Sequence, residues 1–267
     1  MINWSVSPNI FSIGPLQVRW YGLLFMTGFF LGFLFMQKIC RVEKVPIAKL
    51  DSLLIHLLVG TGLGARLGHC FFYEWGYYSE HLLEIPQIWR GGLASHGGAL
   101  GVIIAVILFV KKNPEFKLFW LLDRLAVPVA LTGAFIRLGN LMNSEIIGRP
   151  TDLPWSFIFE QVDKIPRHPT QIYESLCYLF VWAGGIYWYR RFKFNPPNGF
   201  LFGWTLAGIF TARIFLEFLK ENQEAFESTM VLNMGQLLSI PYVVVGYYLF
   251  LRTVRSNPLD TKLKTKL

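Results

Sequence analysis

The sequence predicts an all-α polytopic membrane protein with seven transmembrane helices. Of its 267 residues, 53% are hydrophobic and only 16% are charged, whereas about a quarter of the residues are charged in a typical soluble protein. The mean hydropathy is +0.41, and apolar runs recur at roughly the 20-residue length that spans a bilayer. The weak alternating pattern of a transmembrane β-barrel is absent. We therefore expect residues 1–267 to form a single integral membrane domain.

The first three predicted spans are separated by loops of different chemistry. We expect these spans at residues 16–37, 51–72 and 93–110. The loop after the first span is basic, and the loop after the second is aromatic and acidic. The second span contains the small-residue run Gly60–Ala65, which predicts close packing against another helix.

Four further spans complete the predicted bundle. We expect them at residues 118–138, 170–189, 200–219 and 233–251. The longest loop, residues 139–169, separates the fourth and fifth spans, and its polar residues and prolines exclude a simple span. The sequence NPPNG at Asn195–Gly199 predicts the turn between the fifth and sixth spans.

The charges of the loops predict the orientation of the chain. The loops after the first, third, fifth and seventh spans contain 15 Lys and Arg residues, whereas the loops on the opposite side contain five. Because basic loops are retained in the cytoplasm, we expect a periplasmic N-terminus and a cytoplasmic C-terminus. The segment between the fourth and fifth helices is then a larger periplasmic segment.

Several classes of partner and site are excluded by composition and motif. The net charge is +8, but the basic residues gather in alternate loops rather than in a stripe with aromatic residues, so we expect no nucleic-acid partner. Cys40, Cys70 and Cys177 are isolated, which indicates neither disulfides nor a metal site. The sequence has no P-loop, dinucleotide fingerprint, HExxH or GxSxG motif. It also has no pattern of a cleaved signal peptide.

Polar side chains gather at the predicted outer ends of the spans. The stretch Arg137–Arg149, RLGNLMNSEIIGR, directly follows an apolar run long enough to cross the bilayer. Polar groups at such a boundary are costly unless they are paired or solvated, and they indicate function. The other polar residues expected at this depth are Tyr21, Arg66, His96, His168, Glu174, Arg213 and Glu217.

This cluster has the chemistry of a phospholipid headgroup site. Guanidinium groups are planar donors suited to phosphate, and arginines at headgroup depth indicate recognition of anionic lipid. A transporter or flippase for an anionic lipid or solute is an alternative that shares such a cluster. That class, however, typically shows inverted repeats and polar groups on both faces, and neither pattern is evident.

Six motifs in order resemble the prolipoprotein diacylglyceryl transferase family over nearly the whole chain. They are RWYG from Arg19, GGLASHGGALG from Gly91, RLGNLMNSEIIGR from Arg137, RHPTQIYE from Arg167, ARIFLEF from Ala212 and NMGQLLSIP from Asn233. Two positions depart from the family pattern. Ile136 stands where the family usually has Gly, and Leu219–Asn222 stands where it often has Arg-x-Pro-Asp.

The resemblance implies an enzyme of the bacterial inner membrane that starts lipoprotein maturation. The implied reaction transfers the diacylglyceryl group of phosphatidylglycerol to the lipobox cysteine thiol of a preprolipoprotein signal peptide, forming a thioether and releasing glycerol 1-phosphate. It implies no metal and no diffusible cofactor. The positions that the resemblance implicates in activity are Tyr21, His96, Arg137, Asn140, Glu145, Gly148 and Arg213.

The chemistry of the reaction suggests roles for these residues. A thiol attacks as its thiolate, so a neutral His96 is the first candidate for the base and His168 is the second. Arg137 and Arg213 would stabilise the charge that grows on the leaving phosphate. The remaining substrate-binding candidates have positioning roles: Tyr21 and Asn140 at the glycerol or phosphate oxygens, Glu145 at an arginine, and Gly148 where the backbone passes close to the lipid.

Overall fold

The computed structural model of the chain divides into two compact units. Its described residues are 1–14, 16–87, 92, 94–221, 227 and 230–255, with residues 13, 16, 95 and 96 described for their backbone only. Met1–Met36 and Leu122–Leu267 form one unit, here called the main unit, and Gln37–Leu121 form the other, here called the hairpin unit. The single membrane domain expected from the sequence stays a prediction.

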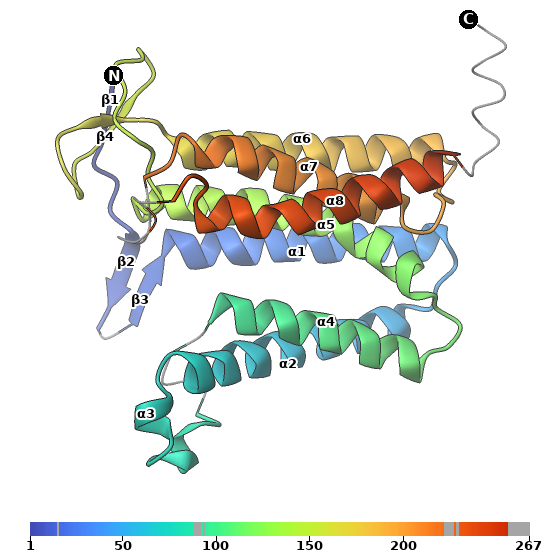
Figure 1. Ribbon diagram of the computed structural model, residues 1–267. Helices are drawn as coiled ribbons and strands as arrows, with labels where there is room; N and C mark the ends of the chain where they lie inside the picture. Colours follow the sequence, from blue (N-terminus) through green and yellow to red (C-terminus); the bar gives the residue numbers. More distant parts are fainter. Residues whose placement is uncertain (15, 88–91, 93, 222–226, 228–229, 256–267) are drawn as a thin grey trace, which may run out of the picture. The chain divides into compact units, whose positions relative to one another are not determined.

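A long helix lies at each of the seven predicted spans, within the described residues. These helices are α1 (Trp20–Val42), α2 (Ile47–Phe72), α4 (Ser95–Lys112), α5 (Leu118–Met142), α6 (Thr170–Arg191), α7 (Phe200–Glu217) and α8 (Met234–Arg255) (Figure 1). Among the described residues, five helices are long and apolar enough to cross a membrane, namely α1, α2, α5, α7 and α8. The crossing by α4 and α6 and the orientation of the chain stay predictions.

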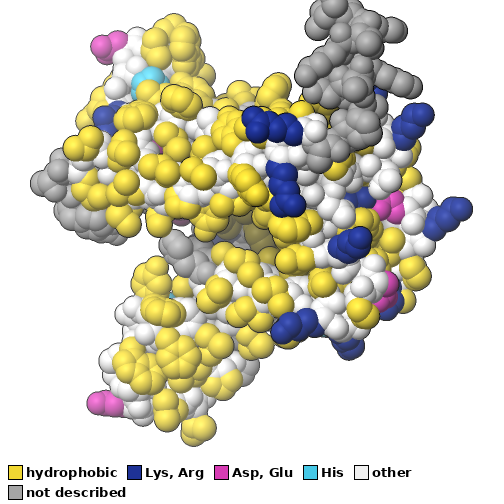
Figure 2. Space-filling view, turned by 45° about the vertical axis from the view of Figure 1, so that its right-hand side comes forward, with side chains coloured by type: hydrophobic (Ala, Val, Ile, Leu, Met, Phe, Trp, Pro, Cys, Tyr) yellow, Lys and Arg dark blue, Asp and Glu magenta, His cyan; other side chains and the backbone are white. Residues whose placement is uncertain are grey.

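The outer faces of the helices expose large apolar side chains. Leu176 and Phe180 of α6 are 60% and 71% exposed, and Val244 of α8 is 62% exposed. Hydrophobic side chains accordingly cover much of the face seen in Figure 2. A contiguous apolar surface of this extent is costly in water but matches lipid acyl chains. The surface therefore agrees with a multi-pass membrane protein.

The structure adds short elements that the sequence analysis did not predict. They are β1 (Ile2–Trp4), β2 (Asn9–Ile13), β3 (Leu16–Arg19), α3 (Trp75–Tyr78), a 3-10 helix (Leu82–Glu84), β4 (Phe157–Phe159) and β5 (Pro166–Arg167). Within the described residues, β4 is the middle strand of a three-stranded sheet, parallel to β1 and antiparallel to β5. Strands β2 and β3 form an antiparallel hairpin that leads into α1.

The three-stranded sheet packs against the end of α5. Phe157 and Phe159 of β4 bury their rings beside Leu141, and Trp4 of β1 joins them at the edge. The indole Nε1 of Trp4 also donates a hydrogen bond to the Leu141 carbonyl oxygen at 3.1 Å. This small core fixes the end of α5, which carries the motif that begins at Arg137.

The beginning of α7 is held by a carboxylate from α5. Asp123 is fully buried, and its Oδ2 and Oδ1 accept hydrogen bonds from the backbone N–H groups of Gly199 and Phe202 at 2.7 and 2.8 Å. The first N–H groups of a helix have no partner within the helix, and they carry partial positive charge. Asp123 therefore acts as a structural cap of α7, supplied by a different helix.

In the hairpin unit, α2 and α4 meet through glycine backbone. A Cβ added at Gly101 would lie 1.9 Å from the Gly60 carbonyl oxygen, and one added at Gly97 would lie 2.2 Å from the Gly64 oxygen. Helix backbones come this close only where side chains are absent. The close packing predicted from Gly60–Ala65 is confirmed.

Replacing Gly101 with valine is expected to destabilise the hairpin unit, because the side chain would collide with rigid backbone rather than with a flexible side chain. Overpacking typically costs about 1–3 kcal/mol and occasionally more. Thermal unfolding in detergent would measure the loss. The control is Gly62→Ala, since no heavy atom lies within 4 Å of a Cβ added at Gly62. Equal melting temperatures of the Gly101 variant and wild type would contradict the packing argument.

Candidate active site

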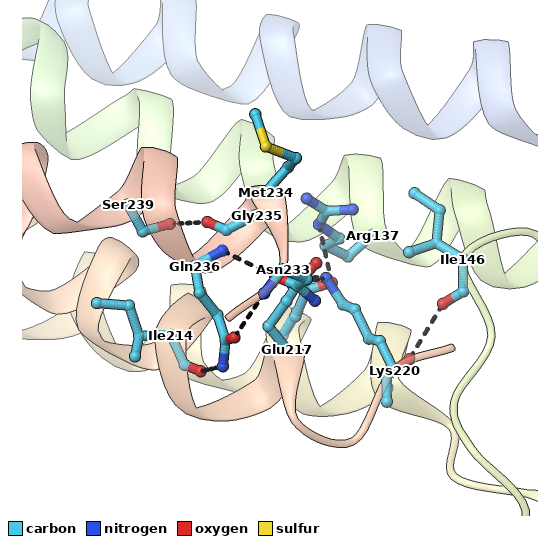
Figure 3. Close-up of polar contacts among 12 residues, drawn as sticks. Arg137, Ile146, Ile214, Glu217, Lys220, Asn233, Met234, Gly235, Gln236 and Ser239 are labelled. Atoms are coloured by element: carbon cyan, nitrogen blue, oxygen red, sulfur yellow. Dashed lines mark hydrogen bonds and ion pairs between the residues drawn. The ribbon is translucent and has the colours of Figure 1, made fainter. Parts of the chain in front are cut away.

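The candidate site lies in the main unit, where the end of α5, the beginning of α6 and the end of α7 meet. Arg137 of α5 places its Nε 3.2 Å from Oε2 of Glu174 on α6. The other oxygen of Glu174, Oε1, is 3.0 Å from Nζ of Lys220, which also lies 2.9 Å from Oε2 of Glu217. We call these four residues the buried ion-pair network. Figure 3 shows the Lys220 side chain reaching toward Glu217 and Arg137.

Burial makes this network electrostatically strong. The side chains of Glu174 and Lys220 are 0% and 1% exposed, and that of Arg137 is 14% exposed. Removing one partner of such a cluster leaves an uncompensated buried charge, which is far more costly than losing a surface pair. Tyr178, one turn along α6, donates a further hydrogen bond to Oε1 of Glu174 at 3.5 Å. The network therefore sets the positions of its members firmly.

A chain of hydrogen bonds joins Arg137 to the segment that follows α5. Nη1 of Arg137 donates to Oδ1 of Asn140 at 3.4 Å, and Nδ2 of Asn140 donates to Oε2 of Glu145 at 3.2 Å. Asn143 donates to the other Glu145 oxygen at 3.0 Å. The carboxylate that pairs with Arg137 is thus Glu174, and Glu145 reaches the arginine through Asn140.

Gln171 of α6 holds the backbone of this segment. Its Nε2 donates to the Glu145 carbonyl oxygen at 2.6 Å. The neighbouring Thr170 donates its hydroxyl to the Ile146 carbonyl oxygen at 3.0 Å. Both residues are fully buried. The first turn of α6 therefore fixes the chain directly after the predicted Arg137–Glu145 site.

Tyr21 packs beside this motif. A Cβ added at Gly139 would lie 2.8 Å from Cδ2 of Tyr21, so the glycine gives the aromatic ring room against α5. The Tyr21 phenol is close enough to feel the charges of Arg137 and Glu145. The structure therefore brings Tyr21, Arg137, Asn140 and Glu145 together, as the sequence predicts for one site.

Arg213 of α7 lies near Tyr178 of α6. Its charge acts on the Tyr178 phenol, as does the charge of Arg137. Arg213 is partly buried, and in the part of the chain that the structure describes no carboxylate forms an ion pair with it. Arg213 thus contributes positive charge that the buried ion-pair network does not balance.

Gly148 and His168 form a second part of the site through their backbones. The N–H of Gly148 donates to the His168 carbonyl oxygen at 3.1 Å, and the N–H of His168 donates to the Arg149 oxygen at 3.1 Å. The imidazole Nδ1 of His168 lies 3.5 Å from the Tyr173 hydroxyl. Gly148 also forms an isolated antiparallel β-bridge with Lys220. The backbone around Gly148 therefore contacts both the residue after β5 and the segment that follows α7.

Two residues of the predicted polar cluster, His96 and Arg66, are not placed in this site by the structure. His96 lies in the first turn of α4, and its side chain is outside the described residues, so its proposed role as base stays a prediction. Arg66 is 2% exposed and donates to the Glu84 and Ile85 carbonyl oxygens at 2.8 and 2.9 Å. These bonds give Arg66 a structural role in the loop after α2.

Lys220 is the residue that the sequence analysis missed. Its side chain is 1% exposed, which makes it one of the most buried charged side chains among the described residues. The signal available in the sequence is its spacing from Glu217, because residues three apart lie on the same face of a helix. The partner on α6, Glu174, is 46 residues away in the chain, and no local pattern identifies it.

Arg167 of β5 pairs with two carboxylates, Asp163 before the strand and Glu221 after α7. Its Nε lies 3.1 Å from Oδ2 of Asp163, it also pairs with Glu221, and its Nη1 donates to the Gly148 carbonyl oxygen at 3.3 Å. Hydrogen bonding from Arg167, with a smaller contribution from the Ile165 N–H, lowers the pKa of the Asp163 carboxyl.

Replacing Asp163 with asparagine is expected to lower the melting temperature at pH 7. Since the pKa is lower in the folded chain than the unfolded value of about 3.9, Asp163 stabilises the fold above about pH 4, and this contribution is lost as the pH falls through the folded pKa. For a partly exposed pair it amounts to about 1 kcal/mol or less. Thermal unfolding at pH 7 and pH 3 should show the difference from wild type shrinking in acid. Asp152→Asn, at an exposed position, is the control, and a difference that persists at pH 3 would contradict this account.

The fold and site together define a multi-pass helical membrane protein with a buried polar site at one end of its main unit. The family model for prolipoprotein diacylglyceryl transferase matches residues 8–252. The chain belongs to the prolipoprotein diacylglyceryl transferase family.

Full-length relatives support this membership. The chain is 48% identical over 257 residues to the phosphatidylglycerol–prolipoprotein diacylglyceryl transferase of Tolumonas auensis, covering 96% of this chain and 99% of the relative. It is 45% identical to the protein of the same name from Chloroherpeton thalassium, covering 97% of each. The corresponding protein of Porphyromonas gingivalis is 44% identical, with 98% of each chain covered.

Proposed function

We propose that this protein transfers the diacylglyceryl group of phosphatidylglycerol to the cysteine thiol of a prolipoprotein lipobox. The thiolate attacks the carbon of the diacylated glycerol that carries the phosphate. A C–S bond forms, and the bond between this carbon and the phosphate oxygen breaks. The leaving group, glycerol 1-phosphate, takes the electron pair, and the thiol proton goes to a base. The products are the thioether-linked lipid and the phosphate monoester.

The observation that carries this proposal is the environment of Arg137 in a chain that belongs to this family. Its guanidinium is held by protein contacts and still has donors for a phosphate. Glu174 pairs with Nε of its guanidinium, and Asn140 and the Tyr178 hydroxyl are its other neighbours. Two of the five guanidinium donors therefore remain for a phosphate. Arg213 adds a second cation that the network does not balance. Preorganised donors at a growing negative charge typically contribute about 3–4 kcal/mol to a transition state. The site therefore suits a reaction in which phosphate charge increases.

The remaining predicted residues have binding roles in this proposal. Asn140, held between Arg137 and Glu145, and Tyr21 would contact the glycerol or phosphate oxygens. The close backbone approach at Gly148 and His168 would keep this edge of the site narrow for the lipid. The acyl chains would remain among membrane lipids beside the exposed apolar faces.

We propose that the protein lies in the bacterial inner membrane with its N-terminus and this site on the periplasmic side. The charge asymmetry of the loops supports this orientation, as 15 Lys and Arg residues lie in the loops of one side and five in those of the other. Phosphatidylglycerol and the signal peptide of the prolipoprotein are both present in that membrane. The polar end of the main unit would then face the headgroup region.

His96→Gln is expected to lower the transfer rate strongly while lipid binding is retained, because glutamine cannot accept the thiol proton. General base catalysis typically contributes 10²–10⁴-fold. Transfer rate and phosphatidylglycerol binding should be measured on the same purified protein. His168→Gln is the comparison, since it tests the second candidate. Full activity of the His96 variant would exclude His96 as the base.

The proposed function is tested with purified protein, phosphatidylglycerol and a synthetic lipobox peptide in detergent. Mass spectrometry and a gel shift should detect the thioether-linked lipid on the peptide, with release of glycerol phosphate. A peptide in which serine replaces the cysteine should remain unmodified. The absence of thioether product in detergent, together with movement of lipid between the leaflets of liposomes that contain the purified protein, would overturn the proposal in favour of a transporter.

A further inference from the structure

The buried ion-pair network contains two carboxylates and two cations, and its contacts are unequal. Glu174 bridges both cations, with Oε2 on Arg137 at 3.2 Å and Oε1 on Lys220 at 3.0 Å. Glu217 contacts only Lys220 among these residues, at 2.9 Å. The order of contacts is therefore Arg137, Glu174, Lys220 and Glu217.

We propose that Lys220 and Glu174 are positioning residues that set the orientation of the Arg137 guanidinium for the substrate phosphate. This inference rests on the proposed function of the same site. In it, Arg137 touches the phosphate, Glu174 holds Arg137, and Lys220 holds Glu174 in place while balancing the charge of Glu217. Lys220 itself does not contact substrate.

The geometry supports this division of roles. A guanidinium has five N–H donors, and a carboxylate paired with its Nε holds the charge in place while leaving terminal donors for a ligand. Nη1 of Arg137 has a long contact to Asn140 at 3.4 Å, and the Tyr178 hydroxyl is a further neighbour of the guanidinium. These contacts and the one to Glu174 occupy three of the five donors, so two remain for a ligand. The anchor Glu174 is 0% exposed, which means that its rotamer is fixed by protein contacts rather than by solvent.

Lys220 is required because the site holds a second carboxylate. Glu217 is 4% exposed and sits against the beginning of α8, where a Cβ added at Gly235 would lie 2.5 Å from its Oε1. Without the ammonium group, two buried carboxylates would share one guanidinium. One carboxylate would then take up a proton or turn away, because an uncompensated buried charge is costly. Arg137 would lose its fixed anchor in either event.

The order of contacts leads to a specific pattern of rescue. Lys220→Met should lower kcat for diacylglyceryl transfer about 100-fold, the effect typical of misplacing a catalytic group by about 1 Å. Adding Glu217→Gln removes the carboxylate that Lys220 balanced and leaves the Arg137–Glu174 pair intact, so most of the activity should return. The double variant Lys220→Met with Glu174→Gln also removes one carboxylate and so restores the charge balance. It loses the ion pair that holds Arg137, however, so its activity should stay low.

The experiment measures kcat, the KM for phosphatidylglycerol and the melting temperature for Lys220→Met, Lys220→Arg and the two double variants. Lys220→Arg keeps the cation and should retain most of the activity. Rescue by Glu217→Gln but not by Glu174→Gln, among variants that melt above the assay temperature, would support the inference. Equal rescue by both, or wild-type kcat in Lys220→Met, would overturn it.

The result also separates this inference from the proposed function. If wild-type protein forms no thioether product, the proposed function fails before any variant is compared. If wild type is active and the rescue pattern is absent, only the positioning role fails. Should Lys220→Met not fold, Glu217→Gln and Glu174→Gln are compared as single variants that retain Lys220. Only Glu174→Gln removes the contact to Arg137, so only this variant should lower kcat.

Discussion

Replacing Arg137 with lysine is expected to lower the rate of diacylglyceryl transfer about 100-fold or more, a loss of the size seen when a preorganised donor is removed. Lysine retains the positive charge. It cannot, however, contact Glu174 through one edge and present further donors to a phosphate through another, because an ammonium group is a point charge rather than a planar fork. Steady-state kcat/KM with phosphatidylglycerol and a lipobox peptide measures the effect.

Arg190→Lys is the matched control for this experiment. Arg190 is exposed in the last turn of α6, at the opposite end of the helix that carries Glu174, and it should tolerate the same change without loss of rate. The melting temperatures of both variants should stay close to wild type. An Arg137→Lys protein with wild-type kcat/KM would show that a positive charge is sufficient at this position. The proposed recognition of phosphate by several guanidinium N–H groups would then be wrong.

Replacing Gly148 with alanine is expected to reduce transfer strongly and to destabilise the site. The added Cβ would lie 2.4 Å from the His168 carbonyl oxygen and 2.5 Å from its Cβ, and the first of these atoms belongs to rigid backbone. The N–H of Gly148 donates to that same oxygen at 3.1 Å, so the chain cannot move apart without losing the bond. Overpacking of this kind typically costs about 1–3 kcal/mol.

The effect on rate should exceed the effect on stability. A shift of about 1 Å near the reacting groups costs on the order of 100-fold in rate, and Gly148 joins the predicted site to Lys220. Gly76→Ala is the control, since no heavy atom lies within 4 Å of its added Cβ. Transfer rate and melting temperature should be compared for both variants, and unchanged rate in the Gly148 variant would remove this backbone contact from the account of the site.

The positions of the long helices could be predicted from the sequence, because the length of an apolar run is a local property. Each predicted span coincides with a helix in the described residues, to within a few residues at most ends. The glycine packing of the second span was predictable for a similar reason, since small residues recur at helical spacing on one face. The short strands β1, β4 and β5 were not predicted, as strands of two or three residues are stabilised only by partners distant in the chain.

The members of the site were predictable as residue types, but their pairing was not. Arg137, Asn140 and Glu145 lie within nine residues, so helical geometry and the family resemblance placed them together. The anchor of Arg137 comes from α6, and Lys220 follows α7, so neither relationship is encoded by local spacing. Glu145, which we expected to hold an arginine in place, reaches Arg137 through Asn140, and the ion pair with Arg137 is formed by Glu174.

Apolar length, loop charge and ordered motifs were thus sufficient to identify a multi-pass member of the prolipoprotein diacylglyceryl transferase family. These features depend on the partition of each segment between water and lipid, which neighbouring residues decide. Which carboxylate pairs with which cation depended on the packing of α5, α6 and α7. Buried charges are costly unless the fold brings groups of opposite charge close to them, and only the three-dimensional arrangement of the helices determines those neighbours.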